Sequence, residues 1–222
     1  MREYIVKRAQ ILKTIQIGNA SIDISNNTHQ YGWMPPLPIG NTLHAQDRYQ
    51  WRAWLMKNHD KETEIWLVLP LKSSGKQRIP YAETVEEALC FGWIDSTVKK
   101  HDEHHTVQRF TPRRKGSGYS QPNKERLRVM AQQGKIIQPI LEKVQNIIDE
   151  EYKYPDDILT ALQQDEETWR NFKGFTEPYK RIRVAFVEDA RKRPEDFNKR
   201  LETLLKKTKA NKKYGYGISR FY

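Results

Sequence analysis

The sequence contains very little cysteine and no long apolar run. Cys90 is the only cysteine in 222 residues, which excludes an intramolecular disulfide and a zinc site made of several cysteines. No apolar stretch approaches the roughly 18 residues that a membrane helix needs. The first residues, MREYIVKRAQILK, are interrupted by charges and lack the apolar centre of a signal peptide. We therefore expect a cytoplasmic protein without a membrane span.

Recognised catalytic signatures are missing as well. The sequence contains no GxSxG, HExxH, CxxC or dinucleotide-binding pattern. Cys90 lies among apolar residues, so we interpret it as a buried small side chain rather than a nucleophile. Glu86 and Glu87 are neighbours on a predicted helix and point apart, which makes them poor acid–base partners. The sequence therefore predicts no catalytic residue and no cofactor.

Positive charge is abundant and unevenly placed. The formal net charge is +11. Residues 99–135 hold ten Lys and Arg against three Asp and Glu, and residues 170–222 hold sixteen against six. Two basic blocks favour an anionic partner. Two solvated helical surfaces would give the same composition, so this interpretation stays open.

Hydrophobic periodicity predicts an α+β fold with a small mixed or antiparallel sheet followed by a helical region. A helix is expected to begin at Asp47, a doubly buried strand over 65–69, a short helix over 82–89 and a hairpin from 93–98 and 106–111. Further helices are expected from Ser120 onward. The predicted organisation is an N-terminal extension (1–45) with short strands around Gly18 and Asn19, an α+β domain (46–150), a helical region (151–210) and a mobile basic and aromatic tail (211–222).

Several stretches resemble a known bacterial family. They are residues 51–59, residues 81–95 with the motif EALCFGWID, and residues 108–114 with the motif QRFTPRR, followed by Ser120 and Asn123. In order and spacing they resemble the YdeI family, also labelled bacteriocin-protection or OmpD-associated, from about Arg48 to Leu205. The resemblance implies a YjbR- or frataxin-like α+β fold and a role in resistance to antimicrobial peptides and envelope stress. It implies no established reaction.

The predicted hairpin carries a possible ion pair. Alternation places Trp93 and Asp95 on one face of the first strand. We predict that Asp95 pairs with Arg109 across the hairpin, in a register centred on Asp102. A slip of one residue would pair Arg109 with Ser96 instead. The pair is interpreted as structural, with a ligand-binding pocket beside Trp93 as the alternative.

A cationic, glycine-containing segment follows the hairpin and precedes a helix. Side-chain cations, free backbone N–H groups and a helix start together can bind an anion. We therefore predict an anion site, with Tyr119 available to stack, formed by Arg113, Arg114, Lys115, Gly116, Gly118, Tyr119 and Ser120. A polar loop without a ligand is the competing interpretation.

The remaining polar clusters give weaker signals. His101, His104 and His105 lie in one predicted turn, which supplies no fixed metal geometry, so no metal is expected. The lysines and aromatic residues after Lys206 could bind single-stranded nucleic acid. The main hypothesis is a non-catalytic protein that binds a small anionic ligand or a protein partner. The alternatives are a nucleic-acid-binding protein and an enzyme with a pocket near Trp93, Asp95 and Tyr119.

Overall fold

The computed structural model describes residues 14–17, 20–23 and 38–222, and the chain divides into two compact units, Met1–Ile39 and Gly40–Tyr222. In the first unit, strands β1 (Thr14–Ile17) and β2 (Ala20–Asp23) pair antiparallel. The sequence predicts one or two short strands in this region, and the structure contains two. The turn predicted between them lies outside the described residues.

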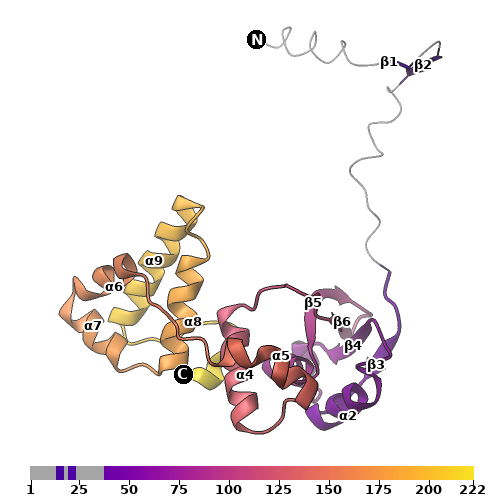
Figure 1. Ribbon diagram of the computed structural model, residues 1–222, viewed down its shortest axis with the longest axis horizontal. Helices are drawn as coiled ribbons and strands as arrows, with labels where there is room; N and C mark the ends of the chain where they lie inside the picture. The colour runs from indigo at the N-terminus through magenta and orange to yellow at the C-terminus, as the bar shows by residue number, and fades with distance from the viewer. Residues whose placement is uncertain (1–13, 18–19, 24–37) are drawn as a thin grey trace. The chain divides into compact units, whose positions relative to one another are not determined.

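The second unit contains a mixed four-stranded sheet with the strand order β3-β4-β6-β5 (Figure 1). Its strands are β3 (Thr42–His44), β4 (Ile65–Pro70), β5 (Trp93–Lys100) and β6 (His105–Pro112). β3 runs parallel to β4, whereas the β4–β6 and β6–β5 pairs are antiparallel. β3 lies within the segment that the sequence assigned to an extension, yet it is an edge strand of this sheet.

Helices α2 (Arg48–Asn58) and α3 (Tyr81–Cys90) pack on the sheet around a cluster of aromatic side chains. Trp51 is fully buried and donates its indole N–H to the Thr84 carbonyl at 3.0 Å. Its ring lies 5.0 Å from Phe110 and 5.5 Å from Trp54, centroid to centroid. Removing such a side chain costs about 3–5 kcal/mol, so this cluster is the main anchor of the sheet.

The rest of the unit is helical, as the sequence predicted, and the α+β fold class is confirmed. The helices are α4 (Gln121–Gln132), α5 (Gln138–Ile148), α6 (Asp156–Gln163), α7 (Glu166–Lys173), α8 (Glu177–Glu188) and α9 (Pro194–Lys209). α6 to α9 gather into one group with a buried cluster of its own (Figure 1). None of the described helices is long and apolar enough to cross a membrane.

Three carboxylates in this unit are almost completely buried, and each faces arginines from another segment. Glu87 of α3 accepts from Arg48 at 2.9 Å and from Arg52 at 2.8 Å, both on α2. Glu125 of α4 accepts both bonds of a bidentate contact from Arg181 of α8, at 2.7 and 2.8 Å. These pairs tie α2 to α3 and α4 to α8.

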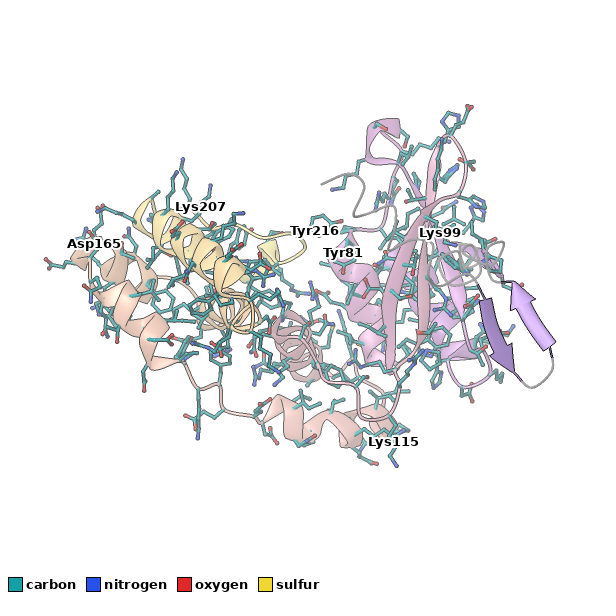
Figure 2. All side chains as sticks on the ribbon, turned by 90° about the horizontal axis from the view of Figure 1, so that it is seen from above. Tyr81, Lys99, Lys115, Asp165, Lys207 and Tyr216 are labelled. Atoms are coloured by element: carbon teal, nitrogen blue, oxygen red, sulfur yellow. The ribbon has the colours of Figure 1, made fainter. Side chains whose placement is uncertain are left out.

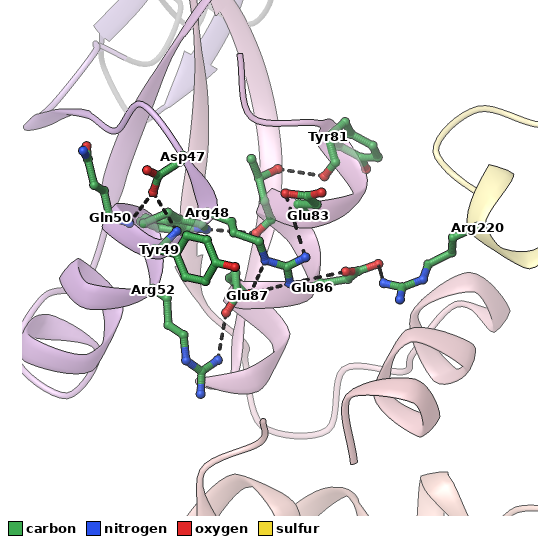
Figure 3. Close-up of polar contacts among 12 residues, drawn as sticks. Asp47, Arg48, Tyr49, Gln50, Arg52, Tyr81, Glu83, Glu86, Glu87 and Arg220 are labelled. Carbon is green, nitrogen blue, oxygen red and sulfur yellow. Dashed lines mark hydrogen bonds and ion pairs between the residues drawn. The ribbon is translucent and has the colours of Figure 1, made fainter. Parts of the chain in front are cut away.

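The third carboxylate, Glu86, forms ion pairs with Arg220 of the C-terminal segment and, at 3.7 Å, with Arg48 (Figure 3). Arg48 thus contacts both Glu86 and Glu87. Glu86 and Glu87, which the sequence placed on diverging sides of a helix, therefore belong to one buried network. Arg48 connects the two carboxylates, which do not contact each other as an acid–base pair.

The C-terminal segment differs from the mobile tail that the sequence predicted. After α9 the chain turns and ends in the short 3-10 helix η2 (Ser219–Phe221). Ile218 and Phe221 are only 3% and 5% exposed, and they pack against Phe175 and Tyr179. The absence of periodicity suggested mobility, but the packing surface comes from distant residues.

Gly92 occupies a position at which a side chain would be strained. It follows α3 with φ +74°, and an added Cβ would lie 2.7 Å from the Ile140 Cδ1 atom of α5. We expect Gly92→Ala to lower the free energy of unfolding by about 1–2 kcal/mol, because the left-handed conformation is strained for alanine. Denaturant unfolding measures this change.

Gly118→Ala is the matched control, since Gly118 has no atom within 4 Å of an added Cβ and does not have a positive φ. We expect its unfolding free energy to stay within about 0.5 kcal/mol of the parent. Equal effects of the two substitutions would contradict the assigned role of Gly92.

Candidate functional site

A pocket of about 1030 Å³ opens beside the sheet, between four segments of the second unit. These are the end of α2 at His59 and Asp60, the α3–β5 turn, the loop from β6 to α4, and helix α5. The volume suits a small organic ligand. Five of the seven residues predicted to bind an anion line this pocket: Arg113, Arg114, Lys115, Gly116 and Tyr119.

The interior of the pocket is apolar. Phe91, Trp93 and Val144 are no more than 2% exposed and lie deepest. Ile140 and Ile147 of α5 are half-buried, so their side chains form a wall that is open to solvent on one side. Apolar surface of this kind stabilises a ligand by roughly 25 cal/mol for each Å² removed from water.

The rim of the pocket is cationic. Arg114, Lys115 and Lys143 are exposed, and none of these three side chains has a hydrogen bond or ion pair with any described residue. Figure 2 labels Lys115 on the loop, projecting away from the ribbon. Among the described residues, Asp60 is the one acidic residue that lines the pocket. The rim therefore presents an excess of positive charge that is not neutralised within the described part of the chain.

Arg113 has a different role from its cationic neighbours. Its guanidinium donates to the Gly118 carbonyl at 2.7 Å and lies 3.7 Å from the centre of the Tyr119 ring. Its backbone N–H donates to the Gly92 carbonyl at 2.9 Å. Arg113 thus holds the loop closed and keeps Tyr119 in place. Arg113 also lines the pocket, so its predicted role in anion binding stays a prediction.

Two of the residues predicted to bind an anion, Gly118 and Ser120, lie on the same loop but do not line the pocket. Gly118 contributes its carbonyl to Arg113. Ser120 is the N-cap residue of α4, as predicted, but its side chain makes no capping hydrogen bond. Gly116 has φ +79°, which turns the loop so that its neighbours face the pocket.

The predicted ion pair between Asp95 and Arg109 is wrong. Asp95 lies opposite Phe110, and a bulge between Asp95 and Val98 shifts the register of the hairpin. The Arg109 guanidinium instead donates to Glu64 at 2.6 Å, on the side of β4. The sequence pattern could not reveal this because the competing strand, β4, lies forty residues earlier in the chain.

The Asp95 carboxylate forms hydrogen bonds with two other side chains. It accepts hydrogen bonds from the Tyr81 hydroxyl at 3.0 Å and from the Gln108 amide at 2.9 Å. Burial and the nearby Asp95 carboxylate raise the pKa of Tyr81 to about 12. Asp95 does not line the pocket, whereas Trp93 does. The two residues that the sequence grouped into one site are therefore separated.

Sequence reasoning missed the contribution of α5 to the pocket. Lys143 and Ile147 follow the helical period of α5, but nothing local indicates what this helix faces. Ile137, which begins the approach to α5, donates its N–H to the Cys90 carbonyl at 3.2 Å. That long-range bond places α5 beside the α3–β5 turn.

Comparison with known proteins gives two separate matches. Residues 43–143 match a family model described as Domain of unknown function (DUF8412). Residues 151–211 match the model described as Bacteriocin-protection, YdeI or OmpD-Associated. The motifs that resemble YdeI proteins in the sequence lie in the first of these segments. No curated protein and no solved structure matches the chain.

The YdeI-type match covers the helices α6 to α9, whereas the pocket is built from residues of the other match and its flank. All lining residues lie between His59 and Ile147. The match to the YdeI-type model and the pocket therefore lie in different parts of the chain.

Metal and thiol chemistry receive no support from the described residues. Among residues 14–17, 20–23 and 38–222, no group of three or more His, Cys, Asp or Glu side chains could hold a metal ion. In the histidine turn, Asp102 accepts from the backbone N–H groups of His104 and His105. His59 is the C-cap residue of α2, and its ring contacts the Leu55 carbonyl at 3.0 Å.

Cys90 is fully buried, and burial raises the pKa of its thiol to about 12. We expect no reaction with a thiol reagent such as 5,5′-dithiobis(2-nitrobenzoate) at pH 8 in the native protein, and complete reaction after unfolding in urea. Absorbance of the released thiolate measures both. Rapid reaction of the native protein would show that Cys90 is an accessible thiolate.

Proposed function

We propose that the protein is a non-catalytic ligand-binding protein that acts in bacteriocin protection and binds an anion with an apolar portion. The observation that carries the proposal is the pocket with an apolar interior and a rim of unpaired cations. The YdeI-type match of residues 151–211 supports the biological setting. Membership of the whole chain in that family, and a cytoplasmic location, are part of the proposal.

The charge distribution determines which end of the ligand lies where. Arg114, Lys115 and Lys143 surround the opening, so the acidic group of the ligand belongs at the rim. Trp93 and Phe91 lie at the floor, so the apolar portion belongs there. Binding through exposed cations gives each contact roughly 0.5–1 kcal/mol, with further affinity from the buried apolar area.

The nucleic-acid alternative receives less support. It requires free aromatic rings beside the lysines of the C-terminal block. Phe221 is buried, and the Tyr216 ring packs 5.1 Å from Tyr81. Lys206, Lys207 and Lys212 are exposed, and the Tyr216 and Tyr222 rings are still 68% and 38% exposed, but each of these rings packs against another tyrosine ring.

The enzyme alternative was tied to a pocket lined by Trp93, Asp95 and Tyr119. Trp93 and Tyr119 do line the pocket, but the acid of this set, Asp95, is bound to Tyr81 and Gln108 elsewhere. The pocket therefore lacks the acid that the proposed reaction needs, and ligand binding accounts for its lining without that acid.

Removing the rim cations tests the proposal. We expect Arg114→Gln combined with Lys115→Gln to weaken binding of decanoate or octyl phosphate roughly 5- to 10-fold, because two charge contacts are lost. Isothermal titration calorimetry at two salt concentrations measures the affinity and its screening.

Lys207→Gln is the matched control, because Lys207 is an exposed lysine of α9 far from the pocket lining. Its affinity for both anions should equal that of the parent. The proposal fails if the parent binds neither anion, or if the double variant binds them as tightly as the parent does.

A further inference from the structure

The C-terminal segment 214–222 lies on a surface formed by α3, α4 and α8, and its contacts are those of a bound peptide. Outside η2, the described segment has no helix or strand. The segment contacts this surface mainly through individual side chains and through the Gly217 carbonyl group. Figure 3 shows Arg220 reaching from this segment to Glu86 of α3.

The ion pair between Arg220 and Glu86 is the polar anchor of the segment. The Glu86 side chain is 0% exposed, and neither of its oxygens accepts a well-aligned hydrogen bond from a described residue. Its second cation, Arg48, is 3.7 Å away and is already bonded to Glu87. Without Arg220, the buried carboxylate would keep only the 3.7 Å contact with Arg48 and the more distant charge of Arg126.

A second anchor joins the backbone of the segment to α4. Arg126, 4% exposed, donates to the Gly217 carbonyl at 2.6 Å. Gly217 has φ +69°, and an added Cβ would lie 2.8 Å from a Tyr81 ring carbon. The Tyr216 ring packs beside the same tyrosine, as Figure 2 also shows.

Apolar anchors complete the contact. Ile218 and Phe221 enter the cluster around Phe175 and Tyr179, and Thr176 donates its hydroxyl to the Phe221 carbonyl. Ile218 and Phe221 are buried, whereas the Arg220 side chain is 33% exposed and only its partner Glu86 is fully buried. Arginine and aromatic side chains are common anchors of a peptide interface.

We propose that this surface is a second binding site, specific for a peptide segment that carries an arginine next to an aromatic residue, and that the chain's own residues 214–222 occupy it. The buried Glu86 carboxylate recognises the guanidinium, Arg126 recognises a backbone carbonyl, and the cluster at Tyr179 takes the aromatic ring. A segment of a partner protein with this pattern enters when the chain's own segment leaves.

Residues 214–222 occupy the proposed peptide site because they are covalently attached to the protein. A tethered segment acts at an effective concentration of the order of millimolar, so it excludes free peptides of modest affinity. A partner must therefore bind more tightly than the attached segment or arrive when it is displaced. This inference is independent of the anion pocket, which shares none of the residues named above.

Cutting the tether in the folded protein tests the site. A protease recognition sequence is inserted between the exposed residues Lys212 and Lys213, and the full chain is folded first and then cleaved. We expect the released segment to separate on gel filtration while circular dichroism shows an intact fold. A fluorescent peptide of residues 213–222 should then rebind saturably, as measured by anisotropy.

Peptide variants test the recognition. Arg220→Gln in the peptide should weaken binding at least tenfold, whereas Ser219→Ala should leave it unchanged because the exposed Ser219 side chain makes no hydrogen bond with a described residue. In protein carrying Glu86→Gln, the difference between the parent and Arg220→Gln peptides should disappear, which isolates the pair.

Three results would overturn the proposal. If the segment stays attached after cleavage under native conditions, or if its release unfolds the protein, the segment is part of the core. Equal binding of the parent and Arg220→Gln peptides would show that Glu86 does not recognise the arginine.

Discussion

The arrangement of the second unit depends on the cost of burying a carboxylate. Glu86, Glu87 and Glu125 are at most 1% exposed, and each is compensated by arginines from another segment. Removing one partner of such a pair typically costs 3–5 kcal/mol, because the other charge remains buried. The three acids therefore determine how α2, α8 and the C-terminal segment sit against α3 and α4. Apolar packing supplies the bulk of the stability, but these pairs select one arrangement among many that would bury similar area.

The cationic side chains fall into two groups: those bonded to other groups of the protein, and those at the pocket rim. Arg48, Arg52 and Arg181 are bound to buried acids, and Arg113 is bound to the carbonyls of its own loop. The cations at the pocket rim have no such partners within the described residues. A basic composition alone cannot distinguish these groups. Their different roles become visible only when the partners of each side chain are known.

Local patterns in the sequence predicted most of the elements, because capping residues, doubly buried strands and helical periodicity are local properties. The Asp47 cap and the buried strand β4 are examples. Two features escaped because they depend on distant residues. Arg109 pairs with Glu64 beside β4, while the hairpin places Val98 opposite Gln108 and, beyond the bulge, Asp95 opposite Phe110. The C-terminal segment looked unstructured because its packing partners, such as Tyr179, lie on another helix. For the candidate pocket, the sequence predicted the contribution of the loop between β6 and α4, but it did not predict the wall formed by α5.

The two edges of the four-stranded sheet have a consequence for behaviour at high concentration. An exposed edge strand is a template on which a strand of another molecule can add, and this leads to aggregation. β3 is only three residues long, so it offers little length for such pairing. β5 carries the bulge after Asp95 and ends in Lys99 and Lys100, so an incoming strand would meet a distorted backbone and positive charge. The bulge and the terminal lysines of β5 thus disfavour the addition of a strand at this edge.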